Sequence, residues 1–590
     1  MGISVAPSVD ETYERTVRAD IEAFRALAEQ YMAGTLTDDD FRGARLRRGV
    51  YGQRQPGVHM IRTKVPGGQL LASQMEALAD VADEFAEGKG HLTTRQNLQY
   101  HFIPTARVAD LLHRLADARL TTREACYNTV RNVTASPLAG LLADEVFDVR
   151  PYVRQVAFAF LHQSLTDNLP RKFKIAFSGS PSDDMALGIH DLGLRAVIRD
   201  GERGFRVVAA GGLGPMPVES QVLDEFLPVD QLVARTESVI RVFNEFGNRQ
   251  NRNKARLKFV IKERGWAWFK ERADAEFADI LAKGGVPVPE EVPEGFGAYE
   301  STPTPLTTGA TLPILNQPLD AEYSRWLATN VREQKQPGYR IVTVAIDQGN
   351  LISSQMRAIA RLARECGDGT IRLGIDQNLH LPFVPESRVA QVYSFLKQFD
   401  LAVPGAGELD DVVTCPGAYS CNLALTKTMG LGHALAETVR RYQRANGHDP
   451  DVAKLRIRAS GCPNACGQHW IGDFGFYGNA RKINGREVPY YLMLLGGGSD
   501  ANDASRFGFA IQSIPARSAP EALTRVLDHY RANRQAGETF REYVQRFQVK
   551  MFRELTADLT KPIELDPDMY KDWGDTVDFS LELGRGECAA

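Results

Sequence analysis

The pattern of hydrophobic and polar positions predicts the same succession of elements in two separate regions of the chain. Short apolar runs predict strands at 60–66, 98–104, 340–346 and 379–385. Helical spacing of apolar residues predicts helices at 10–33, 71–87, 105–117, 353–365, 386–397 and 520–550. Each region has the order strand, helix, strand, helix, which favours an α+β fold with mixed sheets flanked by helices.

The two regions are copies of one another. Residues 70–112 align with residues 351–393 at a constant offset of 281, and the tripeptides SQM and QNL occur in both. The likeness resumes at an offset of 282, where residues 174–194 align with residues 456–476. A period this long indicates an internal duplication and not a solenoid repeat. We therefore expect two homologous halves related by a pseudo-twofold axis, in a three-domain arrangement.

The composition narrows the class of protein. A chain of 590 residues is too long for one hydrophobic core, and 43% hydrophobic with 24% charged residues is typical of a globular protein. No apolar run approaches the ~20 residues that span a bilayer. The N-terminus lacks a signal-peptide layout, and Ala6 does not fit a myristoylation pattern. A net charge of −4 gives no overall basic field for nucleic acid or a membrane, so we expect a cytoplasmic protein without those partners.

Four of the seven cysteines fall close together. The spacing is Cys415-x5-Cys421, then 40 residues, then Cys462-x3-Cys466. A zinc site fits poorly, because its cysteine pairs are usually C-x2–4-C, and a reducing compartment disfavours disulfides. Both pairs lie in turns rich in Gly and Pro, where backbone N–H groups can face thiolates of a [4Fe–4S] cluster. Spacing alone leaves buried structural thiols, zinc and a cluster as alternatives. The first half has Ser180 where the second has Cys462, so the fold does not require these thiols.

The motifs TCPGAYSCNLALT (414–426) and ASGCPNACGQHWIGDFGFYG (459–478), together with LPRKFK (169–174) and TVRN (129–132), resemble the sulfite/nitrite reductase haemoprotein family. The resemblance covers about residues 40–555, includes the duplication, and is strongest to assimilatory sulfite reductase haemoprotein subunits. It implies sirohaem and a [4Fe–4S] cluster bound by Cys415, Cys421, Cys462 and Cys466. Cys466 is expected to bind the sirohaem iron as well.

The resemblance also implies an organisation into seven segments. These are an N-terminal helical segment (1–48), a first ferredoxin-like repeat (49–120), a first-half sirohaem and substrate domain (121–285), a Pro-rich linker (286–325), a second ferredoxin-like repeat (326–405), a second-half [4Fe–4S] and sirohaem domain (406–555) and a C-terminal tail (556–590).

Two sets of polar residues match the family. The anion-binding set is Arg62, Arg131, Lys172 and Lys174. Lys172 and Lys174 alternate across Phe173, so on a strand both would face one side. The sirohaem contacts implied by the resemblance are Thr93, Arg95, Gln99, His101, Arg171, Gln377 and Asn464. We expect Thr93, Arg95, Gln99 and His101 to share one strand face. The basic run at 248–261 is predicted either to lie near a sirohaem carboxylate or to be a solvated helix face.

The implied reaction is the six-electron reduction of sulfite to sulfide in sulfur assimilation, with nitrite reduction to ammonia as the alternative. Nitrite-type members tend to have Asn at the position of Lys174, and sulfite, the more highly charged anion, suits another cation. No flavin or nicotinamide motif is present, so a ferredoxin or a flavoprotein reductase should supply electrons. Some members link a Tyr to a Cys near the active site, and Tyr51 and Cys126 stand at matching positions.

Overall fold

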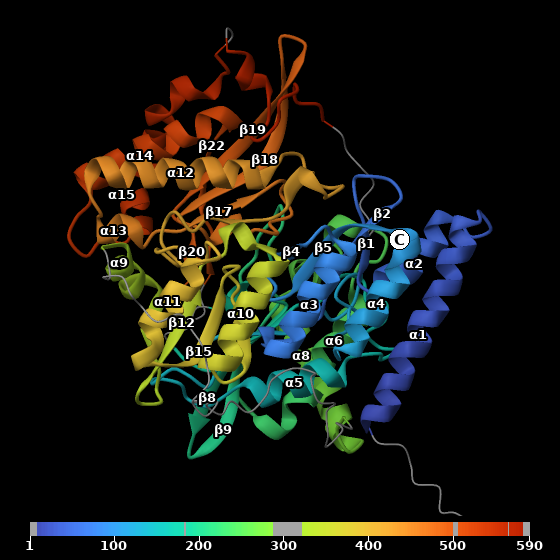
Figure 1. The fold of residues 1–590 in the computed structure, drawn as a ribbon. Coiled ribbons are helices and arrows are strands. Elements are labelled where there is room, and N and C mark those ends of the chain that lie inside the picture. Colours follow the sequence, from blue (N-terminus) through green and yellow to red (C-terminus); the bar gives the residue numbers. More distant parts are fainter. Residues whose placement is uncertain (1–8, 182–184, 287–320, 500–504, 564–565, 582–590) are drawn as a thin grey trace, which may run out of the picture.

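The computed structural model describes residues 9–181, 185–286, 321–499, 505–563 and 566–581, and four five-stranded sheets dominate this part of the chain (Figure 1). The first-half sheet of the ferredoxin-like region has the strand order β1 (Val50–Gly52), β2 (Val58–Arg62), β5 (Leu98–Pro104), β4 (Lys89–Leu92) and β13 (Asn350–Ile352). Its second-half counterpart has the order β11 (Val331–Glu333), β12 (Tyr339–Val344), β15 (Leu379–Pro385), β14 (Thr370–Leu373) and β3 (Gln69–Leu71).

These two sheets exchange an edge strand. β13 belongs to the second half but pairs antiparallel with β4, with Ile352 opposite Lys89. β3 belongs to the first half but pairs antiparallel with β14, with Leu71 opposite Thr370. A reciprocal exchange of this kind is what a pseudo-twofold axis between two copies produces, and the predicted internal duplication is confirmed.

The other two sheets are mixed and also equivalent. One has the order β10 (Gln221–Pro228), β9 (Glu202–Ala209), β8 (Leu192–Arg199), β7 (Ile175–Ser178) and β6 (Thr134–Ala135). The other has the order β16 (Val413–Thr414), β17 (Ile457–Ser460), β18 (Phe474–Ile483), β19 (Arg486–Leu495) and β22 (Phe509–Pro515). In the first of these sheets, β6, β7 and β8 are parallel, and the pairs β8–β9 and β9–β10 are antiparallel. In the second, β16, β17 and β18 are parallel, and the pairs β18–β19 and β19–β22 are antiparallel. A short ribbon pairs β20 (Gly498–Ser499) with β21 (Ser505–Arg506).

Fifteen α-helices in the described residues pack against these sheets and one another. Their bounds are α1 (Val9–Met32), α2 (Asp38–Arg47), α3 (Ala72–Phe85), α4 (Val108–Asp117), α5 (Arg150–Ala159), α6 (Leu232–Phe246), α7 (Leu257–Arg264), α8 (Trp266–Ala282), α9 (Ala321–Asn330), α10 (Ser353–Cys366), α11 (Val389–Lys397), α12 (Thr428–Asn446), α13 (Pro450–Ala453), α14 (Ala519–Asn533) and α15 (Phe540–Leu555). The single helix predicted at 520–550 is wrong: a break at 534–539 separates α14 from α15. The cause is local, because Thr539 and Glu542 form a capping box that starts a new helix.

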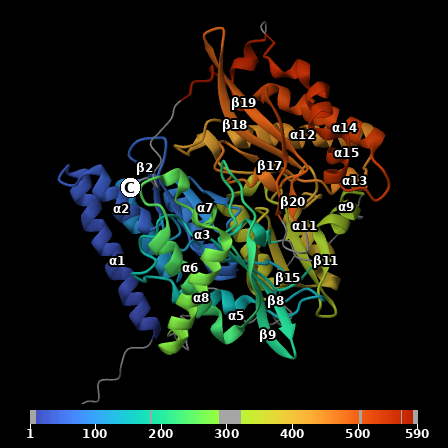
Figure 2. The same cartoon turned by 180° about the vertical axis from the view of Figure 1, so that it is seen from behind.

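Three large hydrophobic cores organise the described residues. The first is shared by both ferredoxin-like repeats, where α3 and α10 lie side by side (Figure 1). It also takes in Phe24 of α1, a helix at the edge of the molecule in both views (Figures 1 and 2). The second lies in the first-half mixed sheet and the third in the second-half mixed sheet. One shared core and two separate ones account for the predicted three-domain arrangement.

Some sequence predictions fall at the edges of the described chain. Most of the predicted linker at 286–325 lies outside the described residues, and residues 321–325 already belong to α9. Within the predicted tail, residues 566–581 pack on the second-half domain, where Met569 and Tyr570 are buried. No helix in the described ranges has both the length and the apolar character that a membrane crossing needs.

Candidate active site

A cavity of about 210 Å³ lies where the first-half sheets face the cysteine turns of the second half. Every residue predicted for the anion, the sirohaem and the cluster lines it. These residues are Arg62, Thr93, Arg95, Gln99, His101, Arg131, Arg171, Lys172, Lys174, Gln377, Cys415, Cys421, Cys462, Asn464 and Cys466. Residues up to four hundred positions apart in the chain thus converge on one space, which is the candidate active site.

Lys172 and Lys174 lie on an extended segment just before β7. Phe173 between them is fully buried in the first-half core, so both lysines face the cavity, as the alternation predicted. Phe173 forms a parallel bridge with Val130, and the backbone N–H of Arg131 donates to the carbonyl of Phe173 at 2.9 Å. This pairing carries Arg131 to the same wall as the two lysines.

Arg62 and Gln99 are neighbours on the paired strands β2 and β5. With its amide oriented to satisfy both side chains, the Gln99 oxygen accepts from Arg62 Nε at 2.8 Å and from Nη2 at 2.5 Å. His101 lies two residues further along β5, on the same face. Neither ring nitrogen of His101 has a hydrogen-bond partner among the described residues, although both are buried. The ring therefore presents unused hydrogen-bonding capacity to the cavity.

The prediction that Thr93 and Arg95 share this strand face is wrong. Both lie in the turn between β4 and β5, because Thr93 Oγ1 donates to Asn97 Oδ1 at 2.7 Å and Gln96 takes a left-handed φ of 53°. The turn still directs Arg95 into the cavity, where Nη2 donates to the carbonyl of Ile175 at 2.8 Å.

The charge of the cavity wall is one-sided. Six of the described lining residues are Arg or Lys and none is Asp or Glu; the six are Arg62, Arg95, Arg131, Arg171, Lys172 and Lys174. Six cations gathered around a cavity whose described wall holds no carboxylate repel one another, so the cavity suits a group that carries several negative charges.

The pKa values express the same imbalance. Burial, followed by repulsion from Arg171, lowers the pKa of Lys172 to about 7. Burial, followed by repulsion from Arg95 and Lys172, lowers the pKa of Lys174 well below its usual range. Burial also lowers the pKa of His101 to about 3, so this ring is neutral. An anion in the cavity would raise the pKa of both lysines towards their usual values.

Backbone carbonyl groups of its own loop hold the Arg131 side chain in place, and a buried ion pair anchors the loop. Arg131 Nε donates to the carbonyl of Tyr127 at 2.8 Å, and Nη1 donates to that of Ala125 at 3.1 Å. Lys64 Nζ lies 3.6 Å from Glu124 Oε2 and donates to the carbonyl of Val130 at 3.3 Å. Burial lowers the pKa of Lys64 and raises that of Glu124. The pair thus anchors both ends of the loop.

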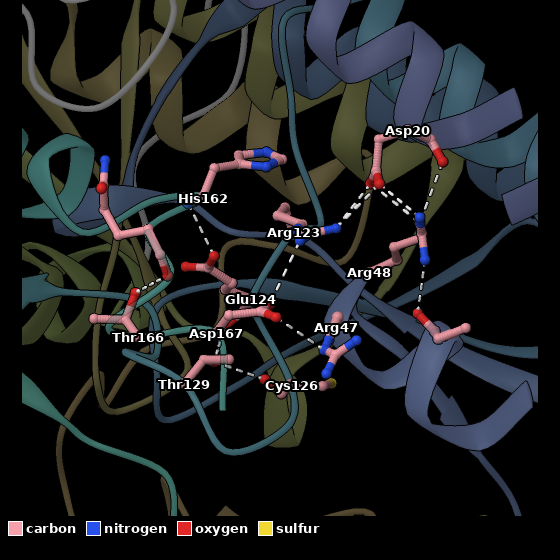
Figure 3. A network of polar contacts seen from close by, with 12 residues as sticks. Asp20, Arg47, Arg48, Arg123, Glu124, Cys126, Thr129, His162, Thr166 and Asp167 are labelled. Carbon is pink, nitrogen blue, oxygen red and sulfur yellow. Dashed lines mark hydrogen bonds and ion pairs between the residues drawn. The ribbon is translucent and has the colours of Figure 1, made fainter. Parts of the chain in front are cut away.

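The N-terminal helix braces the same loop from outside. Figure 3 shows Asp20 of α1 between Arg48 and Arg123: Arg48 Nη2 donates to Asp20 Oδ1 at 2.6 Å, and Arg123 Nη1 donates to Oδ2 at 3.0 Å. Glu124 Oε1 accepts the backbone N–H of His162 at 2.9 Å in the same network. No local sequence pattern predicts these contacts, since they join segments far apart in the chain.

Lys174 has a dedicated support that sequence reasoning missed. Its backbone N–H donates to Asp191 Oδ2 at 2.8 Å, and Arg256 Nη2 donates to the same oxygen at 2.7 Å. Asp191 is fully buried. Of the basic run at 248–261, Arg256 thus acts behind the cavity, and Lys258 Nζ binds backbone carbonyls of the 212–216 loop. A signal for Asp191 did exist, because the D-x-G at 191–193 recurs at 473–475.

The four cysteines stand on two turns of the second half. Cys415 follows β16, and Cys462 follows β17. The backbone N–H of Gly461 donates to Cys415 Sγ at 3.3 Å, and Asn464 Nδ2 donates to Cys462 Sγ at 3.5 Å. Gly461 must lack a side chain, because a Cβ would lie 2.6 Å from the Thr426 carbonyl oxygen. Sulfur-directed N–H groups and close turns suit thiolates that bind a metal group.

The cysteine thiols lie where their thiolates need a positively charged partner. Burial, followed by the neighbouring Cys466, raises the pKa of Cys415 to about 12 and raises the pKa of Cys421 and Cys462 too. None of the six cysteines in the described ranges forms a disulfide. All four thiols line the same cavity, and four thiolates are what a [4Fe–4S] cluster needs.

Comparison with known proteins decides the family. The model described as the nitrite and sulphite reductase 4Fe-4S domain matches residues 126–281 and 406–563. The model of the nitrite/sulfite reductase ferredoxin-like half domain matches residues 51–118 and 332–399. The chain belongs to the nitrite and sulfite reductase family. Its cofactors are accordingly sirohaem and a [4Fe–4S] cluster, and the acid-free cationic wall and the four thiols fit these two groups.

Individual members of the nitrite and sulfite reductase family are similar over most of this chain. A ferredoxin–nitrite reductase of Synechococcus elongatus is 30% identical over 80% of this chain and 86% of its own. A ferredoxin sulfite reductase of Mycolicibacterium paratuberculosis is 27% identical over 87% of this chain and 89% of its own. The structure of Mycobacterium tuberculosis NirA matches with a TM-score of 0.76 at 26% identity, covering 92% of this chain and 97% of that one. The chain is therefore an oxidoreductase of this family.

Proposed function

We propose that this chain reduces sulfite to sulfide for sulfur assimilation, with electrons from a ferredoxin. The observation that supports this proposal is the described wall of the cavity, which has six cationic side chains and no carboxylate. The reaction converts one hydrogensulfite, six electrons and six protons into one hydrosulfide ion and three waters. A small, highly charged oxyanion that loses its oxygens as water needs fixed cations and proton donors around it.

Residues at different places in the cavity bind the cluster, the sulfite anion and the sirohaem. We assign the cluster to the four cysteines at 415, 421, 462 and 466, and Cys466 would hold the sirohaem as well. When bound, the two cofactors would pass electrons from the ferredoxin to the anion. Arg62, Arg131, Lys172 and Lys174 bind and orient the anion. The ammonium groups of Lys172 and Lys174, which a bound anion keeps protonated, can donate protons to the oxygens that leave as water.

The remaining cavity residues hold the carboxylates of the cofactor. We assign that role to Thr93, Arg95, Gln99, His101, Arg171, Gln377 and Asn464. Arg95 and Arg171 would pair with carboxylates, and the unpartnered ring nitrogens of His101 would gain a hydrogen bond.

Nitrite is the second candidate substrate, because the relatives from Synechococcus elongatus and Haloferax mediterranei are named nitrite reductases, at 30% and 28% identity. Sulfite is favoured by Lys174. Its ammonium faces the cavity together with Lys172, and the extra cation matches the higher charge of sulfite.

The test is Lys174→Asn, which shortens the side chain and removes its charge. Sulfite kcat/KM should fall by about ten-fold or more, while nitrite kcat/KM stays within a few-fold. Arg456→Asn is the matched control, since Arg456 is the counterpart of Lys174 at an offset of 282 and does not line this cavity. Equal loss with both substrates would reject the selectivity argument.

The electron donor needs a separate assay. Reduced ferredoxin should support turnover, whereas NADPH with a flavoprotein reductase should not. The purified holoenzyme should show a sirohaem absorption spectrum that shifts when sulfite is added. A protein that stays colourless after expression with ample iron and sirohaem would refute the proposed function.

A further inference from the structure

The C-terminal strap, residues 566–581, lies against the second-half domain beyond the family match, which ends at residue 563. Met569 and Tyr570 are buried against β19. The guanidinium of Arg486 stacks 3.5 Å from the Tyr570 ring and forms an ion pair with Asp578 at 2.8 Å on the surface. The strap, near the red end of the chain in Figure 1, is therefore a fixed part of the fold up to residue 581.

One strap residue, Asp572, contacts the segment that carries Cys415 and Cys421. Asp572 is 1% exposed, and its Oδ2 accepts the backbone N–H of Lys427 at 2.7 Å. Lys427 is the last residue before α12 and closes the turn that holds Cys415 and Cys421. The next residue, Thr428, places its Oγ1 3.7 Å from Cys415 Sγ. The hydrogen bond to Asp572, together with an ion pair between Lys427 Nζ and Asp575 Oδ1, thus connects the strap to the segment that carries the cysteines.

The position of Asp572 is secured from both sides. Trp573 Nε1 donates to the carbonyl of Ala516 at 2.8 Å, and the guanidinium of Arg517 lies 4.2 Å from the Trp573 ring. Arg517 Nη2 also donates to the carbonyl of Asp572 at 3.1 Å. Gly430 of α12 has no room for a side chain, because a Cβ would lie 2.6 Å from the carbonyl carbon of Trp573. The strap and α12 are in direct backbone contact.

The carboxylate also adds charge near the thiols. Burial, followed by the charge of Asp572, raises the pKa of the buried Tyr491 well above its usual range. Asp572 is linked to Cys415 through Lys427 and the adjacent Thr428, inside a buried region where charges interact strongly.

We propose that Asp572 is a positioning residue for the cysteine turn at 415–427: it fixes the turn through Lys427 and supplies a negative charge beside it. The inference rests on the assignment of the four cysteines to the cluster. Its consequence is that a segment outside the family match governs how firmly the cluster is held and how readily it accepts electrons.

Three full-length variants test this. Asp572→Ala removes the acceptor, Asp572→Asn keeps an oxygen acceptor but removes the charge, and Asp578→Asn is the matched control on the exposed face of the strap. Two readouts need no turnover: the rate at which Cys415 and Cys421 react with a thiol reagent in cofactor-free protein, and the rate at which holoprotein loses iron to a chelator. A third is the midpoint potential of the cluster.

Asp572→Ala should react and lose iron about ten-fold faster than the control. Asp572→Asn should stay near wild type in both rates but shift the midpoint potential to a more positive value, because a nearby negative charge is lost. Asp572→Ala and Asp572→Asn that both match Asp578→Asn in all three readouts would overturn the proposal. If the cysteines do not hold the cluster, wild type itself binds no iron, and the thiol rates still decide the role of Asp572. If Asp572→Ala does not fold, Asp572→Asn decides it through the potential.

Discussion

The turn after β7 in the first half and the turn after β17 in the second occupy equivalent places but carry different chemistry. Both strands end in Ser-Gly, at 178–179 and 460–461. In both halves an aspartate accepts a backbone N–H before the strand: the buried Asp191 from Lys174 at 2.8 Å, and the half-buried Asp473 from Arg456 at 2.9 Å. Only the second turn then continues into cysteines. The duplicated framework is common to both halves, and the reactive groups are local additions to it.

The same comparison explains the charge of the active cavity. Arg95, Gln99 and Lys174 have Asp376, His380 and Arg456 as counterparts at offsets of 281 or 282. These counterparts line a separate cavity of about 80 Å³ that also contains Asp411. Cations there have carboxylates beside them, whereas the described wall of the active cavity has none. The unbalanced positive charge therefore belongs to one cavity and not to the fold.

The largest effect should come from removing a thiol that only one half has. Cys462→Ser should lose most of its iron and its activity, since a hydroxyl is a poor cluster ligand at neutral pH. Ser180→Ala, at the equivalent first-half position, should keep full iron content. Iron and sulfide analysis of both purified variants measures this, and a Cys462→Ser protein with a complete cluster would refute the ligand assignment.

Exchanging a cavity residue for its counterpart should destroy the charge asymmetry. Arg95→Asp places in the active cavity the acid that the other half has, and Arg95→Gln removes the cation alone. Sirohaem affinity should fall at least about ten-fold further in Arg95→Asp than in Arg95→Gln, because the new carboxylate repels the carboxylates of the cofactor. Equal sirohaem affinities in the two variants, measured by titrating sirohaem into the cofactor-free proteins, would show that the charge at this position does not control cofactor binding.

The two supporting aspartates should differ in function although they are alike in geometry. Asp191→Asn should lower sulfite kcat/KM about ten-fold, because Lys174 loses its anchor and Arg256 its buried partner. Asp473→Asn should leave kcat/KM within about two-fold, because Arg456 does not line the active cavity. Steady-state kinetics with thermal unfolding of both variants separates a lost anchor from lost stability.

A smaller effect is expected in the pH dependence of stability. The pKa of Lys172 is about 7 in the cofactor-free fold, below its usual 10.5, so the unfolded chain binds more protons between these values. The free energy of unfolding should therefore rise with pH above 7, by up to about 1.4 kcal/mol per pH unit for this group. Lys172→Met should flatten the slope, whereas Lys454→Met, its exposed counterpart, should not. Denaturant titrations between pH 7 and 9 provide the measurement.

The sequence predicted the duplication and the membership of the cavity because both leave local marks. Tripeptides repeat at a fixed offset, and K-F-K alternates about a buried Phe173. The predictions failed where contacts between distant parts of the chain determine the local structure. Arg95 lies in a turn because of hydrogen bonds across β4 and β5, and the pair of Lys64 with Glu124 joins positions that no short motif connects. The role of Asp572 could not be predicted for the same reason, because its hydrogen-bond partner Lys427 lies in another segment of the chain.

The smallest expected effect is a covalent link between Tyr51 and Cys126, which only the first half could form. Tyr51 lines the active cavity and Cys126 is buried next to its lining residue Ala125, whereas Arg332 stands at the position equivalent to Tyr51. If the two residues are covalently linked, the joined peptides weigh two hydrogens less than their sum, because the bond between ring carbon and sulfur forms with loss of two protons and two electrons, which an external oxidant such as dioxygen takes up. Peptide mass analysis of the holoenzyme should find this joined species, and Tyr51→Phe should yield an unmodified Cys126 peptide. Recovery of two separate, unmodified peptides from wild type would show that the cavity works without the link.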